Sequence, residues 1–466
     1  METIVPINHS VSSHSKKCGS TSRHRKRKKT SVLQAISCDH QKEIICLRQW
    51  MKKFSNKPTP NLTSTNNLEK WNSNSQDSNL TRSLTGLRIA LFSTTGRGVM
   101  ALKPIAAGDS IISIPRHLMV SCVDVCNDDV LKKALERTSL KFTSCELLAV
   151  FLLYHAKLKE GSLWKPYVES LPTMFHVASS QAEVELYPSF IASPLSCQLS
   201  ILEVARRKIS CVFKHIPGNT QNISPSDITW SYMAVNSRTV YLKPKERCLF
   251  LCPDDDGSCA LAPFLDFLNH SCEASVSVEL DVNDMYQIVT HVPYAKYDQI
   301  FISYGPHDNV KLFVEYGFFL PNNPHDGVPI SMEDVLSAIH DSHLPDSLTT
   351  SLESKKSIAS SLGEASNMFL ARDGPSWSLT TVVKILLLRD DQIGSWQLAY
   401  EGANADNEAE TRIIICIICS ARQLLKDSLM KMMNLSDKSQ HLVIGCTLVQ
   451  EYVRLVDDCL AAYEKR

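Results

Sequence analysis

The sequence lacks the apolar segments that membrane insertion or export requires. None of its runs approaches the ~18 apolar residues of a membrane-spanning helix, and the richest, Ile413–Cys419, is far shorter. The first twenty residues contain no apolar stretch of the roughly 7–15 residues that a secretory signal needs. We therefore expect no membrane partner. Although the chain has 16 cysteines, we expect reduced thiols in the cytosol or nucleus.

A net charge is also lacking, because 49 basic residues balance 49 acidic ones among 466. No global field therefore draws the protein toward nucleic acid or membrane. One dense basic run, Arg23–Lys29, interrupts a polar N-terminal segment. It indicates either a solvated tail or, as we favour, a nuclear import signal capable of nonspecific nucleic-acid contact. We expect the protein in the nucleus and also in the cytoplasm.

Cysteine pairs with metal-ligand spacing are scarce. Structural zinc sites usually combine two pairs of ligands, each pair two to four residues apart. Among Cys248, Cys252, Cys259 and Cys272 only the first two have that spacing. The pair in Cys416–Cys419 lies in an apolar helical run, where cysteine is a common core residue. We expect no metal, and zinc remains the weaker alternative.

Composition divides the chain into three regions without an internal repeat. Residues 1–84 are predicted to be a basic disordered tail and linker, except for an amphipathic helix at Glu43–Phe54. Residues 85–325 contain strand patterns that flank a helical insert at about 127–235. Residues 326–466 read as helices throughout. The sequence therefore predicts an α+β core followed by an all-helical C-terminal domain.

Individual segments support this division. Capping signals at Thr143–Glu146, Ser224–Asp227 and Ser331–Asp334 predict three helix starts. Trp377, Leu386 and Leu387 are predicted to be core residues rather than contact surface. The predicted strands, and then the longer C-terminal helices, are Ile89–Phe92, Ser110–Ile114, Val276–Leu280, Tyr286–Val292 and Ile300–Tyr304, with Thr380–Leu388, Arg412–Met432 and His441–Leu460.

Short motifs with chemical potential recur in the central region. Asp266–Ser271, which reads Asp-Phe-Leu-Asn-His-Ser, is followed later by Tyr304-Gly305, and Gly96-Arg97-Gly98 precedes both. Each motif alone has an ordinary explanation: Asn-His-Ser as a helix cap or turn, Tyr-Gly as a strand end, and the paired glycines as a hairpin turn. Their combination and order indicate more than three coincidental turns.

Taken in order, these motifs resemble those of the SET-domain methyltransferases. Further matches are Thr94–Gly98, Leu163–Tyr167, Ser237-Arg238, Ser303–Asn309 and Glu315–Phe319. The pattern is similar to the branch that contains RuBisCO large-subunit methyltransferase and the actin-histidine methyltransferase. The resemblance implies a SET β-fold with a helical insert, a C-terminal domain like that branch's substrate-binding domain, and S-adenosyl-L-methionine as cofactor.

The resemblance also implies roles for individual residues. Tyr304 would be the catalytic tyrosine, Arg238 would meet the cofactor carboxylate, and the Asn269-His270 backbone would meet the adenine. Tyr316 and Phe318 would line the substrate lysine channel or cap the adenine, although Tyr316 is as readily explained as core. The implied cofactor-binding set is Gly96, Arg97, Gly98, Arg238, Asp266, Asn269, His270 and Tyr304.

Physical chemistry is consistent with these roles. Glycines 96 and 98 would permit close backbone approach to a cofactor, and the amide of Asn269 suits a zwitterionic end group. A lysine amine must lose its proton, and a desolvated channel lowers its pKa. A Rossmann-type methyltransferase would need a glycine-rich turn between a strand and a helix. Here strand-like residues follow Gly98, so that alternative fails.

The activity that we expect is methyl transfer to lysine side chains of proteins, with histone tails as the expected partner. Two alternatives stay open. One is protein-histidine methylation, which a relative in the same branch performs. The other is a catalytically silent chromatin-binding module, in which Tyr304 is only a structural residue. All three readings require the segments around Asn269-His270 and Tyr304 to meet in space.

Overall fold

The computed structural model describes residues 36–38, 41–55, 80, 84–218, 222–281, 284–397, 407–436 and 438–465. The chain divides into two compact units. The first consists of the residues up to Thr173 together with Ala205–Gly305, and the second of Met174–Val204 together with Pro306–Arg466. Helix α8 (Ser189–Phe213) belongs to both, because the division after Val204 falls inside it.

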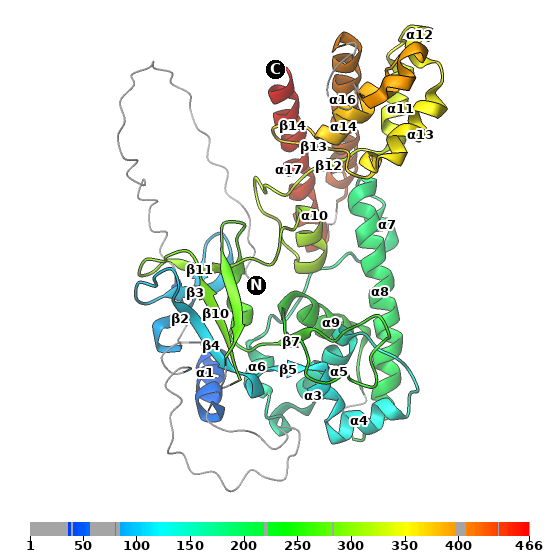
Figure 1. Cartoon of the computed structure of the whole chain (residues 1–466). Helices are drawn as coiled ribbons and strands as arrows, with labels where there is room; N and C mark the ends of the chain where they lie inside the picture. Colours follow the sequence, from blue (N-terminus) through cyan, green and yellow to red (C-terminus); the bar gives the residue numbers. More distant parts are fainter. Residues whose placement is uncertain are drawn as a thin grey trace, which may run out of the picture. The chain divides into compact units, whose positions relative to one another are not determined.

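A five-stranded sheet is the framework of the first unit. Its order is β1-β2-β3-β11-β8, with bounds Ile36–Ser37, Leu87–Phe92, Gly96–Ala101, Gln299–Ile302 and Asn269–His270. Strands β2 and β3 form an antiparallel hairpin (Figure 1). Strand β11 pairs antiparallel with β3 and parallel with β8. The sheet thus brings the N-terminal hairpin beside two segments that lie much later in the chain.

Two three-stranded sheets accompany this framework in the described part of the unit. The first has the order β4-β10-β9, with bounds Ser110–Pro115, Met285–Thr290 and Val276–Leu280. The second has the order β5-β7-β6, with bounds Val120–Ser121, Cys259–Leu261 and Thr239–Tyr241. In the first sheet Ile288 lies opposite both Ile112 and Val278. These apolar pairs explain why the strand patterns were readable from the sequence.

Helices of the insert pack on these strands. They are α3 (Cys122–Cys126), α4 (Asp129–Glu136), α5 (Ser144–Leu158), α6 (Lys165–Ser170) and α9 (Pro225–Arg238). The two helix starts that were predicted within the insert are present as capping boxes, with Thr143 before α5 and Ser224 before α9. Helix α5 is apolar on almost every side and packs against α9. Because α9 ends at Arg238, this packing fixes where that arginine leaves the helix.

The amphipathic helix predicted near Glu43 is present as α1 (Lys42–Phe54) and belongs to the first unit. Its apolar face is buried, and the rings of Trp50 and Trp164 lie 5.1 Å apart. Arg48 Nη1 donates to the carbonyl of Leu87, the first residue of β2, at 3.2 Å. Apolar burial therefore draws this helix, which the sequence predicted within the N-terminal tail, onto the core of the first unit.

The second unit is mainly helical. Its helices are α7 (Gln181–Val184), α10 (Asn309–Lys311), α11 (Met332–Asp341), α12 (Asp346–Thr349), α13 (Leu352–Ser361), α14 (Trp377–Leu386), α16 (Asn407–Met433) and α17 (Gln440–Tyr463), with the first part of α8. A small antiparallel sheet joins β12 (Val328–Pro329), β13 (Phe369–Ala371) and β14 (Gly374–Pro375). Helices α16 and α17 lie side by side, and their apolar faces supply much of the core (Figure 1).

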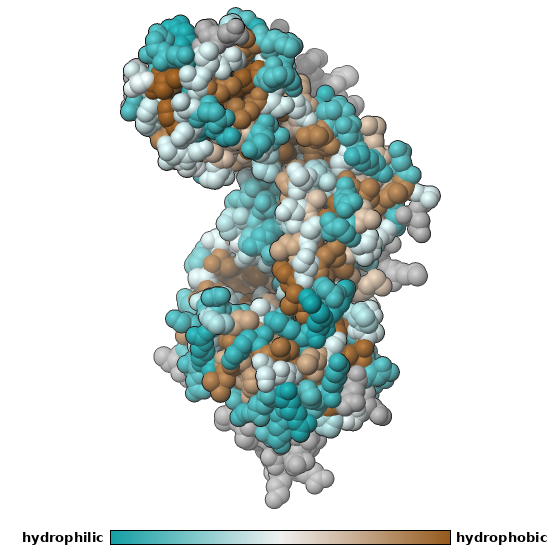
Figure 2. Space-filling model, turned by 90° about the vertical axis from the view of Figure 1, so that its right-hand side faces the viewer, coloured by the Kyte–Doolittle hydropathy of each residue, from teal (hydrophilic) through white to brown (hydrophobic). Residues whose placement is uncertain are grey.

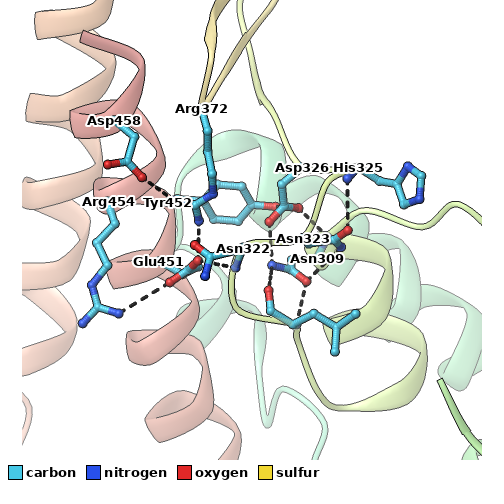
Figure 3. Close-up of polar contacts among 11 residues, drawn as sticks. Asn309, Asn322, Asn323, His325, Asp326, Arg372, Glu451, Tyr452, Arg454 and Asp458 are labelled. Atoms are coloured by element: carbon cyan, nitrogen blue, oxygen red, sulfur yellow. Dashed lines mark hydrogen bonds and ion pairs between the residues drawn. The ribbon is translucent and has the colours of Figure 1, made fainter. Parts of the chain in front are cut away.

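A buried polar network ties α17 to the segment that follows the predicted catalytic tyrosine (Figure 3). The carboxylate of Asp326 accepts from the backbone N–H of Asn309 at 2.6 Å and from the hydroxyl of Tyr452 at 3.1 Å. The preceding residue of α17, Glu451, binds the guanidinium of Arg372. Burial raises the pKa of Asp326 to about 6, although these donors act to lower it. Polar contacts as well as apolar packing therefore define this unit.

The division of the chain differs from the predicted boundaries. The second unit begins at Met174 and takes up part of the predicted helical insert, and its later segment begins at Pro306 rather than at 326. Leu386 and Leu387 are buried, as predicted. Trp377, however, is 53% exposed. It is the first residue of α14, where a side chain can lie outside the apolar stripe of the helix, so its assignment to the core was wrong.

The predicted basic run at Arg23–Lys29 lies outside the described residues. Among those that are described, no helix is both long enough and apolar enough to cross a membrane. On the face shown in Figure 2, hydrophobic side chains form separate areas among hydrophilic ones.

Candidate active site

The two segments that the sequence predicted to meet are neighbours in the first unit. In the parallel pairing of β8 with β11, Asn269 lies opposite Phe301 and His270 opposite Ile302. Tyr304 follows two residues beyond β11, and its backbone N–H donates to His270 Nδ1 at 3.1 Å. The two rings stack with centroids 5.2 Å apart. Because Nδ1 accepts this bond, the neutral ring of His270 carries its proton on Nε2.

The hydroxyl of Tyr304 has a defined direction. It donates to the backbone carbonyl of Leu268 at 2.8 Å, and Leu268 itself is buried. The hydroxyl hydrogen is used in this bond, so the phenol oxygen acts as an acceptor toward any further group. Tyr304 is half-buried, which leaves it within reach of a ligand. The structure thus presents an oriented acceptor oxygen beside Asn269-His270.

The predicted glycine turn lies beside the same strands. Gly96 has φ +69°, a left-handed conformation that favours glycine at the start of β3. Gly98 is required for a different reason. Its backbone is not left-handed, but two side-chain amides lie so close to it that a Cβ atom would not fit. A Cβ atom there would lie 2.5 Å from Gln299 Nε2 and 2.9 Å from Asn269 Nδ2. The close approach that the sequence suggested for a cofactor is made here by two protein amides.

Asn269 holds this turn directly. Its Nδ2 donates to the backbone carbonyl of Arg97 at 3.0 Å and to that of Thr95 at 3.3 Å. The prediction assigned this amide to a zwitterionic ligand, but its nitrogen is engaged within the protein. The contact between Asn269 and the ligand therefore stays a prediction.

A buried charged group lies on the other side of Arg97. Arg238 Nη1 donates to the backbone carbonyl of Asp266 at 2.8 Å and lies 3.4 Å from its Oδ2. The side chain of Asp266 is 0% exposed. Burial raises the pKa of Asp266. Arg238 and Arg97 act to lower this pKa, but their effect is smaller than that of burial. Burial and the nearby Arg238 in turn lower the pKa of Arg97. The buried carboxylate of Asp266 thus pairs with Arg238 and is stabilised at longer range by the charge of Arg97.

Several buried polar atoms in this region have no hydrogen-bond partner among the described residues. They are Arg238 Nε, Asp266 Oδ1, Tyr167 Oη and Gln299 Nε2. Asp266 contributes to raising the pKa of Tyr167, after the larger effect of burial. Unpartnered buried donors and acceptors are costly and call for a ligand or water. The Arg238 donor, the Asp266 acceptor and the Tyr167 hydroxyl, which can act as either, suit the carboxylate and ammonium of an S-adenosylmethionine amino-acid end, so these residues fit that cofactor.

The predicted substrate-channel residues belong to the second unit. There, Tyr316 ends a π-helical turn (Leu312–Tyr316), and its ring lies 6.2 Å from that of Phe318 and 6.3 Å from that of His307. Burial raises the pKa of Tyr316 to about 12, so its hydroxyl stays protonated at neutral pH. Their assignment to a lysine channel stays a prediction.

The cysteines depart from the expectation of uniformly reduced thiols. Cys126 on α3 and Cys248 in the loop after β6 form a disulfide whose Cα atoms are 6.4 Å apart. Burial of both residues brings together positions 122 apart in sequence, a proximity that cysteine spacing could not reveal. Cys248 is thereby removed from the candidate zinc ligands. Nowhere in the described ranges do three or more His, Cys, Asp or Glu residues gather as a possible metal site.

Sequence reasoning missed some residues that shape the site. Thr95 Oγ1 donates to Gln299 Oε1 at 2.9 Å, which links the glycine turn to β11. Ser170 accepts a hydrogen bond from Arg97 Nη1 at 3.2 Å through its backbone carbonyl. A backbone acceptor leaves no trace in a sequence. Gln299 offered one weak signal, since it is a polar residue at the start of an apolar strand.

Comparison with known proteins agrees with this geometry. Residues 96–305 match the SET domain family. The chain is 32% identical over 464 residues to SET domain-containing protein 4 of Homo sapiens, which covers 93% of each protein. The chain therefore belongs to the SET-domain family of S-adenosylmethionine-dependent methyltransferases, and the predicted family is confirmed.

Other relatives place the chain within this family. It is 30% identical to SET domain-containing protein 4 of Mus musculus, over 86% of each protein. It is 23% identical to the actin-histidine N-methyltransferase of Mus musculus, over 54% of this chain and 42% of that protein. A crystal structure of the SET domain of LSMT bound to lysine and AdoHcy matches with a TM-score of 0.51 and 16% identity, over 82% and 87% of the chains. That structural likeness confirms the predicted fold.

Proposed function

We propose that this chain transfers a methyl group from S-adenosyl-L-methionine to lysine side chains of proteins, with histone tails as the substrate class. One observation carries the proposal. Tyr304, Asn269-His270 and the Gly96–Gly98 turn converge in one unit through hydrogen bonds between segments far apart in sequence. The LSMT SET domain of the same fold was crystallised with lysine and AdoHcy, which supports this choice of amino acid and cofactor.

The chain's own residues bind and orient rather than react covalently. When bound, S-adenosylmethionine supplies a methyl group activated by a sulfonium. Tyr304 presents its phenol oxygen as an acceptor, because its hydrogen is directed to Leu268. Such an oxygen can hold a polarised methyl group through C–H···O contacts. Alignment of donor and acceptor can contribute about 7–11 kcal/mol of the barrier reduction.

The acceptor amine must be neutral when it attacks. A free lysine has a pKa of about 10.4, and removing it from water lowers that pKa because burial disfavours the ammonium. The carbonyl that holds Tyr304 belongs to Leu268, which is buried together with Phe267. An amine held at a similarly dry position would favour its neutral form. The proposal therefore requires no dedicated general base.

Histidine methylation is the second candidate function. It is favoured by the likeness to the actin-histidine N-methyltransferase, which is lower in identity and shorter in coverage than the likeness to SET domain-containing protein 4. A third candidate is a silent docking module, in which the Tyr304 hydroxyl serves only to hold the Leu268 carbonyl. We also propose that the enzyme acts in the nucleus and cytoplasm, on the basis of the basic run Arg23–Lys29.

The test is a methyl-transfer assay with radiolabelled cofactor, core histones and total cell protein, followed by mass spectrometry of the labelled residue. We expect label on lysine from the wild type, and a loss of at least tenfold in Tyr304→Phe with cofactor affinity retained. Tyr297→Phe is the matched control, since Tyr297 is 53% exposed in the same unit. Label on histidine would contradict the lysine assignment. Equal activity of Tyr304→Phe would contradict the catalytic role, and no transfer at all would support the docking module.

A further inference from the structure

Gln299 occupies a position that neither the family match nor the sequence motifs assign. It is the first residue of β11, opposite Met100 of β3. Its Oε1 accepts a hydrogen bond from Thr95 Oγ1 at 2.9 Å. The side chain therefore reaches from β11 to Thr95, the residue that precedes the glycine turn.

The same amide closes the space beside Gly98. Its Nε2 would lie 2.5 Å from a Cβ atom at that position, and Asn269 Nδ2 would lie 2.9 Å from it. Asn269 Nδ2 in turn donates to the carbonyls of Thr95 and Arg97. Two amides, one from β8 and one from β11, thus hold the turn from Thr95 to Gly98. We call Gln299 and Asn269 the amide clamp.

The clamp is not built for stability alone. Gln299 Nε2 is buried and has no hydrogen-bond partner in the part of the chain that the structure describes. A buried donor without a partner costs about 1–3 kcal/mol, more than the ~0.5–1.5 kcal/mol that one hydrogen bond returns. An apolar side chain of similar length would avoid that cost. Stability alone therefore does not explain a glutamine at this position, and its hydrogen bond to Thr95 favours a role in shaping the turn.

We propose that Gln299 is a positioning residue that fixes the Thr95–Gly98 turn for the cofactor. It acts through Thr95 and does not itself take part in methyl transfer. The inference rests on the cofactor use stated under the proposed function. It goes further by assigning affinity for S-adenosylmethionine to a hydrogen bond between Thr95 of the Thr94–Gly98 motif and Gln299, which lies outside the motifs.

The test combines calorimetric titration of S-adenosylmethionine with thermal unfolding of the full chain. Gln299→Met removes the amide at nearly equal length, and Thr95→Val removes its donor. Losing one hydrogen bond of ~0.5–1.5 kcal/mol weakens cofactor binding roughly three- to tenfold. We expect each variant to show this loss and the double variant to show no more than either single variant. We expect Thr95→Ser, which keeps the hydroxyl, to restore binding.

The stability readout separates positioning from a merely structural role. Gln299→Met eliminates an unpartnered donor, so we expect a midpoint of unfolding that is unchanged or higher. Gln287→Met is the matched control, because Gln287 lies on β10 and donates to Asp281 at 3.0 Å, away from the turn. It should leave cofactor affinity unchanged. A lower midpoint for Gln299→Met with wild-type affinity would overturn the inference. Failure of the wild type to bind the cofactor would instead overturn the proposed function.

Discussion

Replacing Glu183 should remove much of the acid sensitivity of the second unit. Glu183 lies on α7, and its side chain is only 8% exposed. Oε1 accepts from Ser439 Oγ at 3.0 Å and lies 2.9 Å from His441 Nδ1, while Oε2 accepts from the backbone N–H of Ser179 at 3.0 Å. Burial by itself raises the pKa of Glu183, but the hydrogen-bond donors lower it by a larger amount. The pKa therefore falls from 4.5 to about 2.

The size of the effect follows from this pKa. A pKa that is lower in the folded than in the unfolded chain stabilises the fold above the unfolded value and loses that stability as the pH falls. A difference of roughly 2.5 pH units corresponds to about 3 kcal/mol. The contribution of Glu183 is therefore complete above about pH 5 and is lost between about pH 4.5 and pH 2.

The assay is urea unfolding of the wild type and of Glu183→Gln at a series of pH values. At pH 7 we expect the variant to be about 2–4 kcal/mol less stable, because the amide also leaves a donor without an acceptor. Below pH 4 the two proteins should converge. Glu185→Gln is the matched control, since Glu185 is exposed two residues away, and it should change stability by less than about 0.5 kcal/mol. A Glu183→Gln protein with wild-type stability at pH 7, or with a constant deficit down to pH 3, would refute the reasoning.

Two further predictions concern the first unit. Gly98→Ala should weaken S-adenosylmethionine binding at least tenfold while lowering stability by only about 1–3 kcal/mol, because the new Cβ meets flexible amide ends rather than backbone. Titration of the cofactor and thermal unfolding measure the two effects. The control is Gly161→Ala, because a Cβ atom at Gly161 would have nothing within 4 Å. Reduction of Cys126–Cys248 should lower stability by up to about 5 kcal/mol, since the bond closes a long loop. Unfolding with and without reductant measures this, and a Cys126→Ser protein that is as stable as the oxidised wild type would contradict it.

The sequence predicted the features that depend on local patterns. Thr143 and Ser224 begin helices as their capping boxes indicated, because a cap is complete within four residues. The strands β4, β9 and β10 lie within two residues of their predicted bounds, since apolar residues define them. Strand β11, however, ends at Ile302, so Tyr304 lies beyond the strand that was predicted to contain it.

Features that depend on long-range contacts were not predictable in this way. The burial of α1 requires Trp50 to meet Trp164, and the disulfide requires Cys126 to meet Cys248. Neither proximity is encoded by periodicity or spacing. The division of α8 between two units is similarly invisible, because the helical pattern continues across Val204. A single sequence therefore specifies the helices and strands better than it specifies which of them contact one another.

In the candidate site, too, the motifs indicate which residues are involved but not which atoms they contact. The motifs predicted Asn269 and Arg238 as members of the site and assigned both to the cofactor. In the structure, Asn269 Nδ2 holds the glycine turn and Arg238 Nη1 holds Asp266. A side chain with several donors can serve the protein with one atom and a ligand with another. The atoms left over, including Arg238 Nε, are those that a sequence motif cannot specify.

Buried atoms without partners therefore indicate where binding energy is available. A donor that the folded protein leaves unsatisfied has already lost its contact with water, so a ligand that reaches it gains a hydrogen bond with little further desolvation. Arg238 Nε is such a donor, and Asp266 Oδ1 is such an acceptor. Their stability cost is borne by the apolar core of the first unit, in which α5 and α9 pack together.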